Sequence, residues 1–350
     1  MLDNYAIESG LYALNEQKAG KFTFKYGLRY SLFQNIGKAT VFSYDSLYHV
    51  SDSSFYEKGE IFNHYNFLEP RLAVNFEINQ KSSVKASYSR TYQYLTLAQN
   101  STSGTPLDIW FSSSPNVKPQ NSDLFAAGYF RNFHDGDIET SVEVYYKKIH
   151  NVIDFRDHAI LFLNEKLEGE LRVGSGYAYG IETLIRKNNG KFTGWVTYTY
   201  SRSFRDIEAI SEKPYPAPYD KPHSAAIVLS YDISKRWIVS ANWTYATGLP
   251  ATFPTGRAVF AGKIIPVYSD RNAYRIPDYH RMDMSVTYKS KEGKKWQSEW
   301  NLSVYNVYNR KNVWSINFVT DENDPTVTYA EKTYLFSVIP AITYNFYFNK

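Results

Sequence analysis

The chain has 350 residues, a formal net charge of +4 and an aromatic content of 17%. The 39 basic and 35 acidic residues are mixed along the chain, so the charge gives no case for nucleic-acid binding. The absence of cysteine excludes a disulfide framework and thiolate metal sites. No apolar run reaches the roughly 18 residues that a membrane-spanning helix needs.

Alternation of apolar and polar residues with a period of two predicts about thirteen β-strands. Within residues 21–33, Phe22, Phe24 and Tyr26 share one face, whereas Lys25 and Arg29 share the other. For the stretches 120–131 and 191–202, either face could be the apolar one. In chain order, the predicted strands cover residues 3–14, 20–33, 66–78, 83–95, 120–131, 137–148, 176–186, 192–202, 221–231, 236–246, 279–290, 296–307 and 334–348.

The connections alternate between tight turns and long polar loops. The predicted turns are NEQKA, NQKS, NFHDG, KNNGK, DISK and KEGKK, and the predicted loops cover roughly residues 34–65, 96–119, 149–175, 203–220, 247–278 and 308–333. Within 149–175, VIDF and AILFL could pair as a short extension. Short turns at one end and long loops at the other are typical of an antiparallel transmembrane β-barrel.

The two faces of the predicted strands differ in charge. Charged residues are nearly absent from the faces assigned outward, as expected where one at mid-bilayer costs roughly 2–4 kcal/mol. We expect the opposite face to line a wet lumen or to contact a polar plug, through Lys25, Arg29, Arg71, Glu77, Lys85, Glu143, Lys147, Glu182, Arg186, Asp283 and Glu299. A soluble sandwich would need another surface to bury the outward aromatic residues.

The number of predicted strands, thirteen, is odd, which bears on whether they can close a barrel by themselves. A closed single-chain bacterial barrel has an even number of strands and both ends on the periplasmic side. With the last strand running toward the tight turns, the first must start at the loop end. The first residues, MLDNYAIESG, also lack a signal peptide. We therefore expect residues 1–350 to form one barrel region, the C-terminal fragment of a larger barrel.

Seven segments resemble the C-terminal barrel half of the TonB-dependent outer-membrane receptors. Each is weak alone, but together they cover nearly the whole chain in the family order. They are FLEPRLAVNFEINQKSSVKASYSR (67–90), SSPNVKPQNSDLFAAGYFRNF (113–133), VEVYYKKIHNVIDF (142–155), LEGELRVGSGYAYGIETLIRKNNGKFTGWVTYTYSRS (167–203), YRIPDYHRMDMSVTY (274–288), WNLSVYNVYNRKN (300–312) and IPAITYNFYF (339–348).

The resemblance implies a 22-stranded barrel with a plugged lumen, in contact with outer-membrane lipid. It also implies TonB-driven uptake of a scarce nutrient such as an iron chelate, cobalamin, a glycan or a peptide. The plug and the TonB-contacting segment are absent from the sequence, so we expect no active transport by this chain alone, and a TonB contact only through the missing N-terminal region. The alternatives are a self-contained passive porin and a soluble β-rich glycan-binding module.

The long loops carry aromatic and cationic residues that would lie near the outer mouth and capture ligand. These are Tyr92, Tyr94, Trp110, Arg205, Tyr215, Tyr219, Tyr274, Arg275, Tyr279 and His280. The alternative interpretation, which we favour for any single residue of this set, is that it belongs to an aromatic girdle or to ordinary loop packing. We expect no catalytic constellation, no metal site and no cofactor. The motif GSGYAYG at 174–180 is not followed by a helix pattern, and Gly180 is expected to mark a close approach or curvature within a strand.

The last strand alternates strictly. Ile342, Tyr344, Phe346 and Phe348 would form its lipid-facing row, while Thr343 would face inward. The resemblance implies that this strand seals the barrel against the first strand. It also implies that the barrel assembly machinery recognises the terminal aromatic pattern. Such signals usually end on the aromatic residue itself, whereas here Asn349 and Lys350 follow Phe348.

Overall fold

The computed structural model of the protein describes residues 5–98, 109–161, 164–291, 296–324 and 327–348. Their main feature is one antiparallel sheet of fourteen strands, in which consecutive long strands are hydrogen-bonded neighbours. Its strands are β1 (Tyr5–Ala19), β2 (Phe22–Ile36), β5 (Ile61–Asn79), β6 (Ser82–Gln93), β9 (Gln120–Phe133), β10 (Ile138–Phe155), β11 (Leu171–Lys187), β12 (Phe192–Asp206), β13 (Tyr215–Pro216), β14 (His223–Asp232), β15 (Trp237–Ala246), β20 (Tyr279–Lys289), β21 (Trp296–Tyr305) and β24 (Ile339–Phe348).

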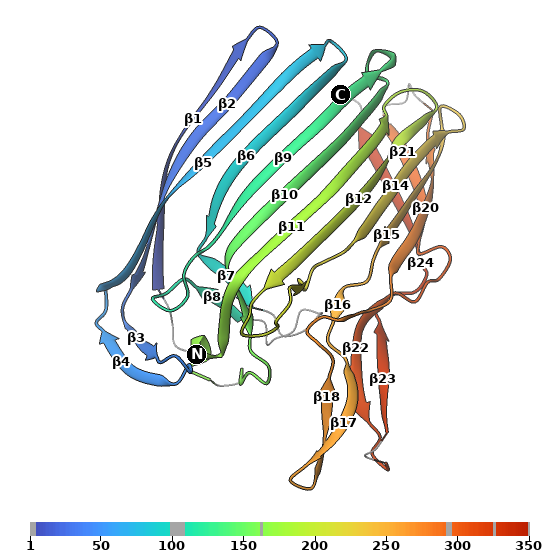
Figure 1. Ribbon diagram of the computed structural model, residues 1–350. Helices are drawn as coiled ribbons and strands as arrows, with labels where there is room; N and C mark the ends of the chain where they lie inside the picture. Colours follow the sequence, from blue (N-terminus) through green and yellow to red (C-terminus); the bar gives the residue numbers. More distant parts are fainter. Residues whose placement is uncertain (1–4, 99–108, 162–163, 292–295, 325–326, 349–350) are drawn as a thin grey trace.

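The antiparallel all-β prediction is confirmed, because each of the thirteen long strands overlaps one predicted strand and β13 adds a short pairing to β12. The last strand is shorter than predicted, since only 339–348 of the predicted 334–348 belong to it. Figure 1 shows an arched sheet whose short turns lie at one end and whose long connections lie at the other. Tyr5 pairs with Ile36 at the loop end, and Phe348 pairs with Trp296 at the turn end. The first and last strands therefore run in the expected directions. In the described residues the sheet is open, because β1 and β24 each have one neighbour.

Several connections differ from their prediction. NEQKA lies inside β1, and the first turn is Gly20–Lys21, where Gly20 has a φ of 61°. VIDF extends β10 and pairs with Leu171–Gly174 of β11, whereas the described part of AILFL, residues 159–161, belongs to no strand. Residues 162–163 of AILFL and 292–295 of KEGKK lie outside the described residues.

The predicted loops also contain strands of their own. Backbone hydrogen bonds formed within a projecting loop replace those that water would otherwise supply, which explains why these segments form hairpins despite their polarity. The additional strands are β3 (Ala39–Tyr44), β4 (Val50–Tyr56), β7 (Leu95–Ala98), β8 (Ile109–Ser112), β16 (Pro250–Ala251), β17 (Pro254–Phe260), β18 (Lys263–Tyr268), β19 (Tyr274–Arg275), β22 (Val313–Thr320) and β23 (Thr328–Tyr334).

Helix is nearly absent from the part of the chain that the structure describes. The described residues contain two 3₁₀ turns, η1 (His134–Gly136) and η2 (Leu167–Glu170), and no helix among them is long and apolar enough to cross a membrane. The GSGYAYG motif lies in β11 and does not open a helix. A side chain on Gly180 would lie 2.6 Å from the Tyr200 carbonyl oxygen and 2.8 Å from the Tyr145 ring. The expected close approach at this glycine is confirmed.

The register assigns side chains to two faces of the sheet. Residues directly opposite each other in an antiparallel pair point to the same side, and the pairing runs from Lys25 through Ala73, Ser87 and Ala126 to Tyr145. Traced across all thirteen long strands, this pairing puts every charged residue expected in the lumen on one face, here called the inner face.

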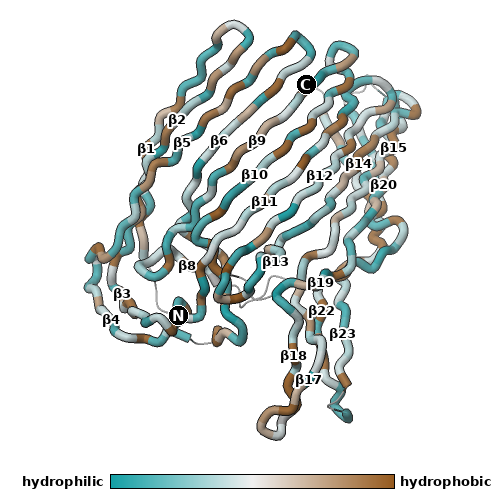
Figure 2. The backbone as a smooth tube through the Cα atoms, in the orientation of Figure 1, coloured by the Kyte–Doolittle hydropathy of each residue, from teal (hydrophilic) through white to brown (hydrophobic). Residues whose placement is uncertain are grey.

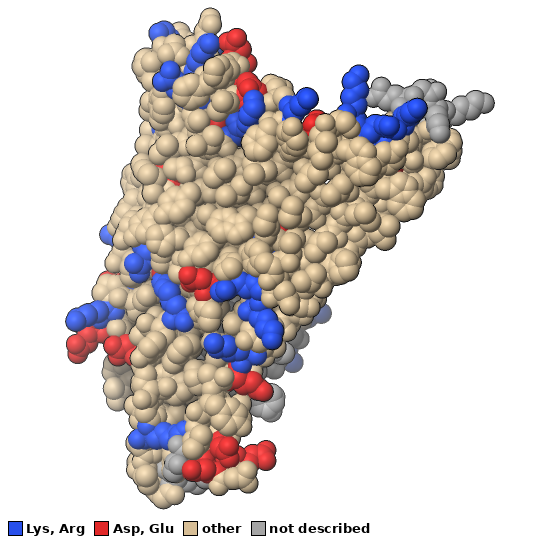
Figure 3. All heavy atoms as spheres, turned by 90° about the vertical axis from the view of Figure 1, so that its right-hand side faces the viewer, with Lys and Arg blue, Asp and Glu red and all other residues tan. Residues whose placement is uncertain are grey.

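The opposite, outer face is apolar along its middle. It carries large side chains that are about half exposed, including Leu72 at 52%, Phe125 at 52% and Tyr146 at 47%. The register also settles the two ambiguous stretches, since Phe125 and Tyr198 lie on this face. Figure 2 shows the alternation of hydropathy along the strands, and Figure 3 shows an uncharged band between two belts of charged side chains. The band follows from the period of two in the sequence.

The buried core lies at the loop end and not inside the sheet, whose faces are both open. One cluster packs the end of β10 against η2, β8 and neighbouring loop residues: Phe111, Val117, Ile153, Phe155, Leu161, Leu167 and Leu171. A second joins Val152 to Ile207 and Tyr215. Burial of these apolar side chains holds the loops in fixed positions above the ends of the strands.

Candidate functional site: the loop-end mouth

Two buried carboxylates organise the loops at the end of the sheet. Asp154, near the end of β10, is 4% exposed and lies 2.8 Å from Nη1 of Arg205 at the end of β12. The Tyr215 hydroxyl donates a hydrogen bond to the same carboxylate oxygen, Oδ2, at 2.8 Å. Arg205 and Tyr215 pair directly across β12 and β13. The structure therefore brings together two of the residues predicted for the mouth, on an aspartate that was not predicted.

Burial sets the protonation of this group. Tyr215 is 4% exposed, and burial, followed by the nearby negative charge of Asp154, raises the pKa of its phenol well above the usual range. The hydroxyl therefore stays protonated and acts as a donor at any physiological pH. The charge of Asp154 is balanced by Arg205, so this group presents no net charge to a ligand.

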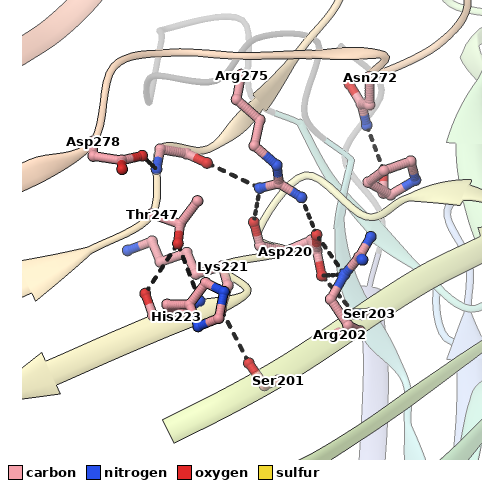
Figure 4. A network of polar contacts seen from close by, with 12 residues as sticks. Ser201, Arg202, Ser203, Asp220, Lys221, His223, Thr247, Asn272, Arg275 and Asp278 are labelled. Carbon is pink, nitrogen blue, oxygen red and sulfur yellow. Dashed lines mark hydrogen bonds and ion pairs between the residues drawn. The ribbon is translucent and has the colours of Figure 1, made fainter. Parts of the chain in front are cut away.

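The second carboxylate, Asp220, precedes β14 and joins three segments of chain (Figure 4). It accepts a hydrogen bond from the Ser203 amide at 2.7 Å and another from Nη2 of Arg275, and its side chain is fully buried. Nε of Arg202 lies 3.4 Å away. Arg275 also donates to the Asp220 carbonyl at 2.7 Å and to the Gly248 carbonyl at 2.9 Å. Its planar guanidinium, with five donors, suits such a three-way contact.

A third carboxylate closes the network on the side of β20. Asp278 accepts hydrogen bonds from the Tyr245 hydroxyl at 2.7 Å and the Gly248 amide at 2.9 Å. The Tyr245 hydrogen bond is the main cause that lowers the pKa of the Asp278 carboxyl below its usual range, and the Gly248 amide adds to it. In the folded loop, the Asp278 carboxyl is therefore ionised near neutral pH.

Further contacts connect distant loops. Arg271 donates to the Phe155 carbonyl at 2.9 Å and pairs with Asp157 at 2.8 Å. Asn272 donates to the Pro216 carbonyl at 2.8 Å. The segment 247–278 is thereby attached both to the end of β10 and to the loop that contains β13. Together with Asp154, Asp220 and Asp278, these contacts form one continuous polar network around the loop end of the sheet.

The other aromatic residues predicted for the mouth occupy different environments. Trp110 is 62% exposed, Tyr219 is 60% exposed, and Tyr274 stacks on Phe253. Tyr94 is buried, where it shares a hydrogen bond of 2.6 Å with Ser31.

The register separates the remaining predicted mouth residues. Tyr92 continues the outer-face row of β6 in the register, but its ring stacks at 3.9 Å between centroids on Phe67, which belongs to the inner-face row of β5. The contact occurs beyond Arg71 and Ser89, where β5 and β6 are no longer paired. Tyr279 and His280 are neighbours in β20 and therefore point to opposite faces, His280 to the outer one, where it bonds Tyr308 at 2.8 Å. The geometry of His280 matches the alternative interpretation of an aromatic girdle at the edge of the apolar band, whereas Tyr92 contacts a residue of the inner-face row.

The inner face combines small residues with charged ones. A hollow of about 490 Å³ near the turn end is bordered by Lys25, Lys85 and Glu143 and floored by Ala126 and Gly128. Cross-strand ion pairs occur on the same face, such as Lys25 with Glu16 at 2.9 Å and Arg186 with Glu139 at 3.6 Å. The Asn75 Oδ1 atom is buried there without a hydrogen-bond partner among the described residues.

Sequence reasoning missed Asp154, Asp220, Asp278 and Asn272. Each lies in a loop or at a strand end, where no periodic pattern distinguishes a buried aspartate from an exposed one. Their partners are far away in sequence, for example 55 positions between Asp220 and Arg275. The described residues contain no group of three or more histidine, aspartate or glutamate side chains that could hold a metal ion.

Comparison with solved structures gives the same architecture. The ferric-catecholate import receptor Fiu from Escherichia coli superposes with a TM-score of 0.62 at 15% identity, covering 98% of this chain and 45% of that one. The ferric citrate transporter FecA gives 0.61 at 12% identity, with 98% and 45% covered. The pyoverdine receptor FpvA from Pseudomonas aeruginosa gives 0.61 at 14% identity, with 98% and 42% covered. The chain spans less than half the length of these structures, and their identities support the fold alone.

The sequence itself supplies the family. No curated protein matches it significantly. Residues 2–309, however, match the family described as TonB dependent receptor-like, beta-barrel, which is a family of receptor and transporter barrels and covers most of the sheet described above. The resemblance read from the seven segments is confirmed, and the chain belongs to the TonB-dependent receptor-like β-barrel family.

Proposed function

We propose that this chain forms part of the wall and the ligand-capturing mouth of an outer-membrane importer that takes up a scarce nutrient with energy from TonB. The family to which the chain belongs is characteristic of the bacterial outer membrane. The observation that carries the proposal is the sorting of side chains by the register, with a polar face of both charge signs behind an apolar outer band. Such sorting suits a sheet with lipid on one side and a wet or plugged lumen on the other.

The mouth network supports a role in ligand capture. Its arginines are already bound to Asp154 and Asp220, so they hold the loops in place more than they offer free charge. Among the aromatic residues of the predicted site, Trp110, Tyr219 and Tyr274 have the largest exposed fractions, so a ligand could reach part of each ring. Aromatic surfaces with few free charges suit an aryl chelate, a sugar or a peptide.

Iron chelates are the first ligands to test. The solved structures with the same fold include receptors named for ferric catecholates, ferric citrate and pyoverdine. Cobalamin, glycans and peptides are the other candidate classes. On this proposal the charged inner face contacts a plug domain, and the chain does not transport actively without it.

Uptake in cells tests the proposal. The full-length protein that contains this sequence should accumulate radiolabelled iron from a ferric chelate only while TonB is present, because gating and energy coupling lie outside the sheet. Accumulation that continues without TonB would contradict the proposal and favour a passive pore. Retention of the folded protein in the aqueous fraction without detergent would favour the soluble module.

The mouth is tested by a pair of matched variants in the same assay. Trp110→Ala removes a ring that is 62% exposed at the loop end, and should raise the half-saturating chelate concentration about fivefold or more. Trp300→Ala removes the same ring from the outer face, where it is 45% exposed, and should leave that concentration unchanged. Equal effects of the two substitutions would remove Trp110 from the proposed site.

A further inference from the structure

The outer face carries a group of cationic side chains at the loop-end edge of its apolar band. Arg90 on β6 and His150 on β10 both approach the carboxylate of Asp123 on β9. Arg90 binds it in a bidentate manner, with Nε and Nη2 at 2.8 and 2.9 Å, whereas Nε2 of His150 lies 4.0 Å away. Lys148 is directly opposite Asp123 in the register and therefore points to the same side. We call Arg90, Asp123, Lys148 and His150 the rim cluster.

The rim cluster has more positive than negative charge. Asp123 is its single carboxylate and is 12% exposed at the side chain, since Arg90 and the Tyr88 hydroxyl at 2.7 Å already occupy it. Lys148 is exposed and makes no hydrogen bond or ion pair to any residue that the structure describes. One positive charge, that of Lys148, is therefore left unbalanced. An uncompensated cation beside hydrocarbon is costly unless an anion reaches it.

An apolar groove leads away from this cluster. It has a volume of about 540 Å³ on the outer face of β2, β5 and β6. The outer-face residues Phe24, Tyr26, Leu72, Val74, Ala86 and Tyr88 line it, and the intervening residues Lys25, Ala73 and Ser87 also border it. Tyr88 connects the two features, because its ring borders the groove while its hydroxyl bonds Asp123. Arg90 is two residues from Tyr88 toward the loops, a rise of about 7 Å. β2, β5, β6, β9 and β10 are consecutive neighbours in the sheet (Figure 1).

We propose that the rim cluster and this groove together bind a phosphorylated glycolipid of the outer leaflet, with a phosphate at Lys148 and Arg90 and an acyl chain along the groove. A phosphate offers the charge that Lys148 lacks, and Arg90 can share its remaining donor capacity with it. The groove supplies apolar surface at the depth where a chain would leave the head group. The choice of the outer leaflet rests on the outer-membrane placement in the proposed function, which puts the loop end of the sheet outside the cell.

Lipid binding to the full-length protein, delipidated in a non-ionic detergent, tests the proposal. Native mass spectrometry with added diphosphoryl lipid A as the probe should detect one tightly bound equivalent. Lys148→Gln should lower its affinity about tenfold, as expected for loss of one charge-assisted contact. Lys147→Gln is the matched control, because it removes the same charge from the next residue, on the inner face. Ala86→Trp should also weaken binding, by filling the groove.

Two outcomes would contradict the proposal. Equal affinities of the Lys148 and Lys147 variants would show that the rim cluster is only an ion pair at the membrane edge. Equal affinity of the wild-type protein for phosphatidylglycerol would show a general attraction for anionic lipid. Folding is checked by the difference in migration between the unheated and the heated protein on a denaturing gel. Uptake is measured separately with the same variants, so lost lipid binding with intact uptake leaves the proposed function unaffected.

Discussion

Replacement of Asp220 by asparagine should open the loops above the strands without disturbing the sheet. The substitution preserves the size of the side chain and an oxygen that can accept from the Ser203 amide. It removes the negative charge that Arg275 contacts and places an amide group, itself a donor, among two guanidinium groups. The side chain has no exposed surface in the folded protein, so water cannot replace the lost acceptor.

The size of the effect follows from these contacts. Loss of a hydrogen bond to a charged group costs about 1.5–3 kcal/mol, and removal of one partner from a buried pair costs about 3–5 kcal/mol. Arg202 and Arg275 keep 26% of their side-chain surface exposed, which places the expected cost at the low end of this range. A cost of about 3 kcal/mol corresponds to an increase in local opening on the order of a hundredfold.

Hydrogen exchange of the full-length protein in detergent measures this opening. Exchange of the amides in residues 203–220 should accelerate on the order of a hundredfold, whereas amides in the middle of β12 should not change. The matched control is Asp157→Asn, since Asp157 also pairs with an arginine, Arg271 at 2.8 Å, but is 70% exposed. An exposed pair contributes about 1 kcal/mol or less, or about fivefold in opening. Equal acceleration by the two substitutions would refute the assignment of Asp220 as the point that joins the loops.

Three further substitutions test other parts of the structure. The pKa of Asp278 is lower in the folded protein than in the unfolded chain, so its stabilising contribution is present above about pH 4 and is lost as the pH falls through the folded-state pKa. Pepsin should therefore cut the wild-type loops increasingly as the pH falls below about 4. The loops of Asp278→Asn should show no such increase. Gly180→Val places carbon against a carbonyl and a ring and should destabilise the sheet by about 1–3 kcal/mol in a thermal gel-shift assay, whereas Gly256→Ala, with its nearest neighbour at 3.9 Å, should not. Phe348→Ala should sharply reduce the folded protein in the outer membrane, whereas Tyr347→Ala, on the inner face, should not; equal levels of the two variants would contradict an outer-face assembly signal.

The strands were predictable because their chemistry is local. In β2, Phe22, Phe24 and Tyr26 alternate with Lys25, and the same period of two fixes which side of the sheet each residue occupies. A slip of one residue would move Lys25 into the apolar band, so the pattern determines the register as well as the strand. The ends of the strands were less predictable. NEQKA has the composition of a turn, yet its residues pair with β2 until Gly20 allows the chain to reverse.

The mouth was only partly predictable, because its contacts join residues far apart in the chain. Arg205 and Arg275 were expected near the mouth from their positions in loops, but nothing in their neighbourhoods predicts that each would bind a buried aspartate. Tyr94 was expected to be an exposed aromatic residue of a loop. It is instead buried against Phe33, because the chain bends after β6. Such placements depend on how the hairpins pack on one another, and a period of two does not describe that packing.

The central claim is that the outer face meets lipid and the inner face meets water or a plug, and cysteine scanning tests it most directly. These 350 residues contain no cysteine, so single cysteines can be placed in β10 from 142 to 147 without background from this part of the protein. At Val142, Val144 and Tyr146, a fluorophore should be quenched by brominated lipid; at Glu143 and Lys147 it should not be. Alternating quenching with a period of two is the predicted result, and equal quenching at successive positions would contradict the account.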